Sequence, residues 1–239
     1  MGAAIGSVLR QRGTEVLWAS DGRSAETEAR AARAGLRDVG GIDELARRSD
    51  VILSVCPPHA AADVAASAGA FDGVYVDANA VSPTTVRAIA AMLPHFVDGG
   101  IVGGPPTLET GPRLYLAGAD AQRVAVLLEG TPVGTRVLSS RPGDASAVKM
   151  VYAAWTKGTA ALLLAIRQTA RAEGVEEALL AEWRESLPQL ESRLDAAARS
   201  AERKGWRWVG EMEEIAATFA AAGQPDGFHR AAAEVFRRA

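Results

Sequence analysis

The sequence is poor in the residues that mark several classes of protein. Among its 239 residues there is one cysteine, Cys56, which excludes a disulfide scaffold and suits a reducing cytoplasm. The three histidines, His59, His95 and His229, have no spacing typical of a metal site, so we expect no metal. The formal net charge is only -3 and no stripe of lysine or arginine stands out, so we expect no nucleic-acid partner.

The sequence also has no apolar run long enough to cross a membrane. Its longest strongly apolar run, residues 160–166, is far shorter than the roughly 20 residues that a membrane helix needs. No basic segment followed by an apolar core stands at the start, so no secretion signal is expected. A hydrophobic fraction of 48% and a charged fraction of 23% are ordinary for a globular protein. We therefore expect a cytoplasmic protein without a membrane partner.

The first two thirds of the chain alternates between strand and helix patterns. Strands are expected at residues 14–19, 50–55, 73–76, 113–116 and 136–138. Helices are expected at residues 1–10, 24–34, 42–48 and 59–67, with one more opened by Ser82 and Pro83 and one capped by Asp120. This alternation predicts an α/β fold with a Rossmann-type, doubly wound and mostly parallel sheet that helices cover on both faces.

After Pro142 and Gly143 the pattern becomes entirely helical. Asp144 is placed to cap a long helix over residues 145–173. Further helices are expected at residues 175–186, 190–204, 212–222 and 228–238. We therefore predict two domains, an NAD(P)-binding α/β domain over residues 1–143 and an all-helical domain over residues 144–239.

The chain opens with Gly2 and Gly6 at the start of a helix. In dinucleotide-binding folds the first strand feeds a G-x-G-x-x-G turn, and the helix N-terminus that follows binds the pyrophosphate. Gly2 corresponds to the third glycine of such a turn, so the first strand and the first two glycines are missing from the sequence. We expect the missing strand to be encoded upstream, and the chain without it to bind a cofactor weakly.

A short polar segment, Ser20, Asp21, Arg23 and Ser24, follows the strand expected at residues 14–19. It stands where such folds contact the adenosine ribose. An acidic residue there favours NAD, whereas an arginine at a helix N-terminus accommodates the extra phosphate of NADP. We favour NADP, with NAD possible; a capped turn with a solvated arginine is the alternative explanation.

Several segments, taken in order, resemble one known family. They are the helix-start glycine, Arg23 with Ser24, residues 54–58 (SVCPP), residues 77–83 (DANAVSP), residues 98–105 (DGGIVGGP) and residues 147–150 (AVKM). Together they are similar to the β-hydroxyacid dehydrogenase and 6-phosphogluconate dehydrogenase superfamily of NAD(P)-binding proteins. Residues 149–158 resemble a subgroup of phosphogluconate dehydrogenase-like proteins that have a helical C-terminal domain of their own.

The resemblance implies an NADP-dependent oxidoreductase that moves a hydride to or from a small polar, hydroxyacid-like substrate. It implies that Lys149 acts as general base in oxidation and as general acid in reduction. It also implies that the amides of Gly103 and Gly104 hold a substrate carboxylate or similar oxygens. The cofactor-binding residues are expected to be Gly2, Ser20, Arg23, Ser24, Val55, Pro57, Pro58 and Asn79.

The sequence departs from the family pattern at three places. Val102 stands where the family usually has a serine, and Ala153 stands where it has a polar amide side chain. The region near residues 211–213 lacks the later lysine of the family. These departures predict altered substrate recognition. They leave open an imine reductase-like activity, and also a non-catalytic NADP-binding protein.

The helix at residues 145–173 carries the expected catalytic group. At about 100° per residue, Lys149, Tyr152, Ala153 and Thr156 share one face. We expect Tyr152 to hydrogen-bond the substrate oxygen as a catalytic residue and Thr156 to contact the substrate. The alternative is that Lys149 only snorkels at the start of a buried helix. Lys157 lies off this face and is expected to be peripheral.

The remaining features are expected to be structural. Residues 160–166 are hydrophobic nearly all round, which favours a helix buried on most sides and a homodimer through the helical domain. The tryptophans are expected in the core or the interface: Trp155, Trp183, Trp206 and Trp208. Three acidic residues are expected at a solvated helix start: Glu211, Glu213 and Glu214. Cys56 is expected to be a small packing residue.

Overall fold

The structure of the protein is a computed structural model that describes residues 1–69 and 71–238. The chain divides into two compact units, Met1–Lys149 and Met150–Ala239. The division lies inside helix α7 (Asp144–Ala172), whereas the predicted domain boundary stands at the start of that helix, after residue 143.

The first unit is built on two sheets. The larger has the strand order β3-β4-β5-β6-β7, and its neighbouring strands are parallel except for β5 and β6, which are antiparallel. The smaller sheet pairs β1 (Leu17–Trp18) in parallel with β2 (Arg37–Asp38). The strands of the larger sheet are β3 (Val51–Ser54), β4 (Val74–Asp77), β5 (Phe96–Val102), β6 (Arg113–Ala117) and β7 (Gly134–Ser139).

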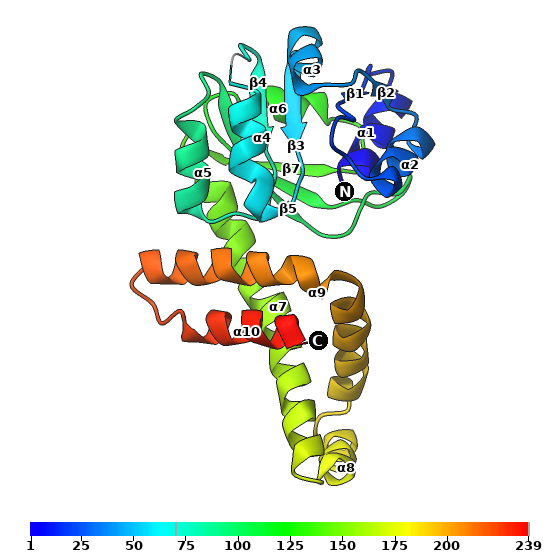
Figure 1. Cartoon of the computed structure of the whole chain (residues 1–239), viewed down its shortest axis with the longest axis vertical. Helices are drawn as coiled ribbons and strands as arrows, with labels where there is room; N and C mark the ends of the chain where they lie inside the picture. Colours follow the sequence, from blue (N-terminus) through cyan, green and yellow to red (C-terminus); the bar gives the residue numbers. More distant parts are fainter. Residues whose placement is uncertain (70, 239) are drawn as a thin grey trace. The chain divides into compact units, whose positions relative to one another are not determined.

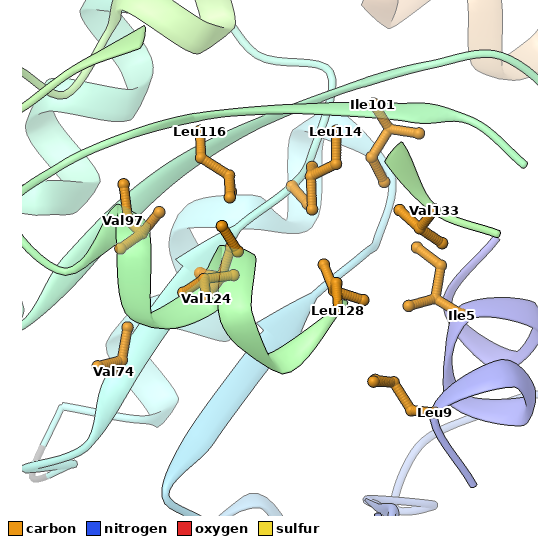
Figure 2. Close-up of a cluster of buried hydrophobic side chains, with 14 of the residues drawn as sticks. Ile5, Leu9, Val74, Val97, Ile101, Leu114, Leu116, Val124, Leu128 and Val133 are labelled. Carbon is orange, nitrogen blue, oxygen red and sulfur yellow. The ribbon is translucent and has the colours of Figure 1, made fainter. Parts of the chain in front are cut away.

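Helices cover both faces of the larger sheet, so the predicted α/β class is confirmed (Figure 1). One face packs against α1 (Gly2–Gln11) and α6 (Ala121–Leu127). Figure 2 shows Val124 of α6 and Leu128, which follows α6, in the same cluster as Leu114 and Leu116, with Ile5 of α1 next to Val133. The other face packs against α3 (Ile42–Arg48), α4 (Ala61–Ser67) and α5 (Pro83–Ala90), and the short 3-10 turn η1 (Pro58–Ala60) precedes α4.

Two helix caps follow the local sequence, whereas Asp120, at the N-cap position of α6, makes no side-chain cap hydrogen bond. The Ser24 hydroxyl accepts a hydrogen bond from the Thr27 amide at the start of α2 (Ala25–Arg33), and the Ser82 hydroxyl accepts one from the Thr85 amide at the start of α5. Gly35, which follows α2, has a φ of 68°, a conformation that favours glycine. Both predicted serine caps and the glycine terminator are confirmed.

Strand β5 has no counterpart among the strands predicted from the sequence. Its residues, FVDGGIV, include two adjacent glycines and an aspartate, which are depleted in strands. All seven are nevertheless buried, because β5 lies between β4 and β6. The pairing with both neighbouring strands outweighs the low β-propensity of these residues. Strand β5 also positions the candidate site described below. The two-residue β2 was not predicted either.

The second unit is helical throughout the residues that the structure describes, as predicted. After α7 come α8 (Glu176–Ser186), α9 (Gln189–Ala221) and α10 (Gly227–Arg238). The prediction of two helices at residues 190–204 and 212–222 is wrong, because α9 continues through both. Gly205, which lies between the two predicted helices, is buried within α9 near the Phe236 carbonyl oxygen of α10. The rings of Trp208 and Phe236 add an edge-to-face contact at 5.1 Å.

None of the helices in the described part of the chain is both long and apolar enough to span a membrane.

Candidate functional site

Helix α7 begins directly on strand β5. A Cβ atom at Gly100 would lie 2.5 Å from the carbonyl oxygen of Ala145 and 3.2 Å from the Cβ of Lys149. No side chain larger than hydrogen fits there without displacing the helix. Gly100 therefore lets the first turns of α7 lie against the strand, and it places the half-buried Lys149 over the sheet.

Asp98 of β5 fixes the start of the same helix. Its Oδ2 accepts hydrogen bonds from the amides of Gly143 at 2.8 Å and of Ser146 at 3.0 Å. Its Oδ1 accepts a 2.6 Å hydrogen bond from the Ser146 hydroxyl. Burial raises the pKa of Asp98 above its ordinary value, although these three donors oppose the shift.

The expectation that Asp144 caps the long helix needs correction. The helix starts at Asp144 itself, and the Asp144 carboxylate instead accepts hydrogen bonds from the side chains of Ser139 and Arg141. The carboxylate that accepts the free amides of the first turn comes from Asp98, 46 residues earlier by number and on a different element. A local reading of the sequence cannot find such a cap, because the partner is distant along the chain.

The ends of β3 and β4 are joined by the side chain of Asn79. Its Oδ1 accepts a 2.6 Å hydrogen bond from the amide of Cys56, which follows β3. Its Nδ2 donates to the Ser54 hydroxyl at 3.1 Å and to the Asp77 carboxylate at 2.9 Å. The side chain is buried, so Asn79 binds these protein groups. Whether it also contacts a cofactor, as the sequence predicts, stays a prediction.

Burial also perturbs the ionisable groups around Asn79. It raises the pKa of Asp77 to about 6, against the hydrogen bonds that Asn79 donates. It raises the pKa of the Cys56 thiol as well, which makes this half-buried cysteine a poor nucleophile and agrees with a packing role. The charge of Arg23 lowers the same thiol pKa by a smaller effect.

Two helix N-termini stand near this end of β3. At Gly2 the start of α1 contacts Val55, since a Cβ on Gly2 would lie 3.5 Å from the Val55 Cβ. Ser24 caps α2, with the exposed Arg23 immediately before it. Ser20 interacts with Asp38 and, together with the Gly40 amide, holds the pKa of Asp38 below its usual value. Ser20 and Asp38 also line a shallow pocket with Trp18, Glu28, Ala32 and Leu36.

The other predicted site residues are distributed as follows. Pro57 is half-buried and Pro58, which opens η1, is buried. Gly103 has a φ of 121° and packs on Pro112, whereas Gly104 is open to solvent. Tyr152 is 45% exposed and Thr156 is also exposed; both belong to the second unit. The structure thus brings Gly2, Val55 and Asn79 to one end of β3 and β4, and places Lys149 of α7 against β5.

The second unit holds a buried ion pair that the sequence reading missed. Nζ of Lys157 lies 2.6 Å from Oε2 of Glu211, and both side chains are buried. Nε of Arg207 donates to the other carboxylate oxygen at 3.0 Å. The expectations that Lys157 is peripheral and that Glu211 stands at a solvated helix start are therefore wrong. The sequence shows a lysine on α7 and a glutamate inside α9. That the two side chains pair depends on how the two helices pack, which the sequence pattern does not show.

Comparison with known proteins gives relatives that are themselves uncharacterised. Residues 170–239 match the family model described as "Domain of unknown function (DUF1932)". An uncharacterised 28.5 kDa protein of Methanothermus fervidus is 32% identical over 170 residues, which make up 70% of this chain and 66% of that protein. The conserved protein MTH1747, of unknown function and structurally similar to 3-hydroxyacid dehydrogenases, is 30% identical with a TM-score of 0.72; the match covers 99% of this chain and 92% of that one.

More distant structures share the fold. A 3-hydroxyisobutyrate dehydrogenase of Salmonella typhimurium has a TM-score of 0.69 at 17% identity, over 99% of this chain and 90% of its own. An imine reductase of Streptomyces aurantiacus has a TM-score of 0.56 at 20% identity, over the same shares of the two chains.

Proposed function

The chain belongs to the NAD(P)-binding superfamily of β-hydroxyacid and 6-phosphogluconate dehydrogenases, and on that premise we propose that it is an NADP(H)-dependent oxidoreductase. Its substrate is a small, polar, hydroxyacid-like molecule. The observation that carries the proposal is the seating of Lys149 against Gly100 of β5, fixed by the Asp98 carboxylate. Both residues contact the start of α7, and together they give Lys149 a defined position over β5.

The residues of the first unit fit a dinucleotide. The amides of Ala4 and Ile5 are bonded to the Met1 carbonyl, which leaves those of Gly2 and Ala3 as free donors at the start of α1, suited to a phosphate. Arg23 and Ser24 at the start of α2 suit the additional phosphate of NADP. Pro57 and Pro58 would line the adenine side of the cofactor, and Asn79 would lie near the nicotinamide ribose. These groups come from segments that the fold brings to the ends of parallel strands, where α/β proteins bind ligands.

When bound, the nicotinamide ring supplies or accepts the hydride. The chain's own residues handle the substrate and its proton. Lys149 donates a proton to the substrate oxygen in reduction and accepts it in oxidation. Tyr152 donates a hydrogen bond to the same oxygen, Thr156 contacts the substrate, and the amides of Gly103 and Gly104 bind its carboxylate.

One observation favours a second candidate, an imine reductase-like activity. Val102 and Ala153 are both buried, so neither position offers a polar side chain to an alcohol or its carboxylate. A carbon–nitrogen double bond needs fewer such partners. The same observation is compatible with a protein that binds NADP and has no catalytic activity.

Turnover measurements separate these possibilities. NADPH and NADH binding is measured first by fluorescence titration. The protein is then assayed against panels of hydroxyacids and of cyclic imines, with Lys149→Met as the test variant. Lys204→Met, at an exposed lysine of α9, is the matched control. We expect Lys149→Met to lose about 100-fold or more of the activity while Lys204→Met keeps it. Full activity in Lys149→Met removes the proposed mechanism.

A further inference from the structure

Two buried carboxylates lie side by side in the larger sheet. Asp77 of β4 and Asp98 of β5 are register partners on neighbouring parallel strands, so their side chains leave the same face of the sheet. Neighbouring strands lie about 5 Å apart, which sets the distance between the two residues. Asp77 is 1% exposed and Asp98 is 0% exposed. Two like charges at this spacing and away from water repel each other, so the pair favours holding one proton.

The hydrogen bonds decide which carboxylate keeps its charge. Asp98 accepts from three donors at the start of α7, the Gly143 amide and the amide and hydroxyl of Ser146. Asp77 accepts only from the backbone and side-chain N–H groups of Asn79 among these printed bonds. The donors at a helix N-terminus favour the charged form of Asp98. Burial raises the pKa of Asp77 to about 6, and the charge of Asp98 adds to that shift. As the pH falls, Asp77 therefore takes the first proton of the pair.

Other ionisable groups surround the pair. They are the Cys56 thiol after β3, the Tyr75 hydroxyl of β4, the guanidinium of Arg87 on α5, which lies against Gly143, and the ion pair of Arg141 with Asp144 at the start of α7. Burial raises the pKa of the thiol and of the phenol, so both stay neutral around pH 7. The arginines keep their charge throughout. Among these neighbours Asp77, with a pKa of about 6, titrates nearest to neutral pH.

Lys149 lies over the same part of the sheet. Its Cβ stands 3.2 Å from the position that a Cβ on Gly100 would take. Gly100 follows Asp98 by two residues on β5, so it shares the face of the sheet that carries the pair and lies about 7 Å further along the strand. Ser146, which donates to Asp98, precedes Lys149 by three residues and stands on the same side of α7. The expected catalytic amine is therefore attached close to both carboxylates.

We propose that Asp77 and Asp98 act as one carboxylate pair under the start of α7, and that the total charge of this pair controls the proton affinity of Lys149. Asp77 is then a positioning residue that acts through the field of the pair and does not touch the substrate. When Asp77 takes up a proton, one negative charge near Lys149 is lost and the neutral amine becomes more favourable. The neutral amine is the form that accepts a proton from an alcohol. The catalytic meaning of this control rests on the proposed function, whereas the charge coupling does not.

The first test needs no ligand. The titration of the Lys149 side chain is followed by NMR in the wild-type protein, in Asp77→Asn and in Asp144→Asn. We expect Asp77→Asn to lower the proton affinity of Lys149 about threefold or more, because a buried charge about 10 Å away has an effect of that size. Asp144→Asn, the matched control, removes a more exposed carboxylate from the same helix start and should change the affinity by less than about 1.5-fold. An unchanged Lys149 titration in a folded Asp77→Asn protein overturns the proposal, and so does an equal shift in Asp144→Asn.

A second readout separates the effect of charge from a displacement of the helix. Hydrogen exchange of the Ser146 amide, which donates to Asp98, is measured in the same proteins. We expect Asp77→Asn to leave this exchange within about twofold of the wild-type rate, because the substitution keeps the shape of the side chain and the bonds to Asp98. If the Ser146 amide exchanges faster whenever the Lys149 titration shifts, the start of α7 has moved, and a purely structural role replaces the proposed one.

The wild-type protein alone also tests the pair. Its Lys149 resonances should show a second, smaller change with a midpoint near pH 6, where Asp77 titrates, and the absence of that change overturns the proposal even if Asp77→Asn does not fold. These measurements need no cofactor, so a protein that binds neither NADPH nor NADH refutes the proposed function and leaves the charge coupling to be decided by NMR. Where turnover is found, the rise of kcat/KM for oxidation with pH should move about half a pH unit lower in Asp77→Asn. A profile that stays in place while the Lys149 titration moves refutes control of the reaction by the pair.

Discussion

The hydroxyl of Ser146 donates a 2.6 Å hydrogen bond to Oδ1 of Asp98, and both side chains are buried. This bond joins the central strand β5 to the first turn of α7, three residues before Lys149. The Asp98 carboxylate therefore ties the position of the expected catalytic amine to the sheet, and it does so from inside the first unit.

Loss of this bond should weaken the protein. Ser146→Ala removes the one side-chain donor to the buried Asp98 carboxylate among the described residues, so we expect the free energy of unfolding to fall by about 2 kcal/mol in urea titrations. Ser139→Ala, which removes a donor to the more exposed Asp144, is the control and should cost less. Equal losses in the two variants would show that burial of Asp98 adds nothing.

Removing one partner of the buried ion pair between Lys157 and Glu211 should lower the stability of the protein. Lys157→Met leaves the buried Glu211 carboxylate with Arg207 alone, so we expect a loss of about 3 kcal/mol in the free energy of unfolding. The double variant Lys157→Met with Glu211→Leu removes both buried charges and should recover much of that stability. A double variant less stable than Lys157→Met alone contradicts this account.

Asp77 should make stability depend on pH with a definite sign. Its pKa is about 6 in the folded protein against an ordinary 3.8, so the folded state holds the proton more tightly. Its contribution is complete below about pH 4 and is lost as the pH rises through about 6. Relative to Asp77→Asn, the wild-type protein should lose about 3 kcal/mol between about pH 4 and pH 7. The other raised carboxyl, Asp98, is present in both proteins, and its charge adds to the raised pKa of Asp77. A pH-independent difference refutes the prediction.

Arg23 should decide between NADP and NAD. The exposed guanidinium stands at the start of α2, where the 2′-phosphate of NADP would bind. We expect Arg23→Ala to raise the dissociation constant of NADPH about tenfold and to leave that of NADH nearly unchanged. Arg33→Ala, at the exposed opposite end of α2, should affect neither. A wild-type protein that binds NADH more tightly than NADPH contradicts this prediction.

The helical unit should form a homodimer through α7. Val151, Trp155 and Leu162 form an exposed apolar stripe on that helix, and Trp155 is 68% exposed. We expect Trp155→Glu to convert a dimer into a monomer in light-scattering measurements. Trp206→Glu, at the exposed tryptophan of α9, tests whether another face is responsible. A monomeric wild-type protein disproves the prediction.

The positions of the four tryptophans could be predicted only in part from the sequence. Trp183 is buried as expected and Trp208 packs on Phe236, but Trp155 and Trp206 are largely exposed. Composition predicts that aromatic residues lie in a core or in an interface but does not say which. The reason is that both environments remove the same apolar surface from water. His229 is similar, since its buried ring packs on Phe219 at 4.2 Å within the second unit.

The sequence alone determined the fold class, the helical C-terminal unit, the serine caps and the family, because these follow from periodicity and from motifs in a fixed order. The tertiary structure decided the features that depend on contacts between residues far apart in the chain. It formed β5 from a glycine-rich segment, capped α7 with Asp98 rather than Asp144, buried Lys157 with Glu211, and engaged the whole amide of Asn79. The physical reason is that each of these features depends on a partner supplied by another element, and local propensity carries no information about that partner.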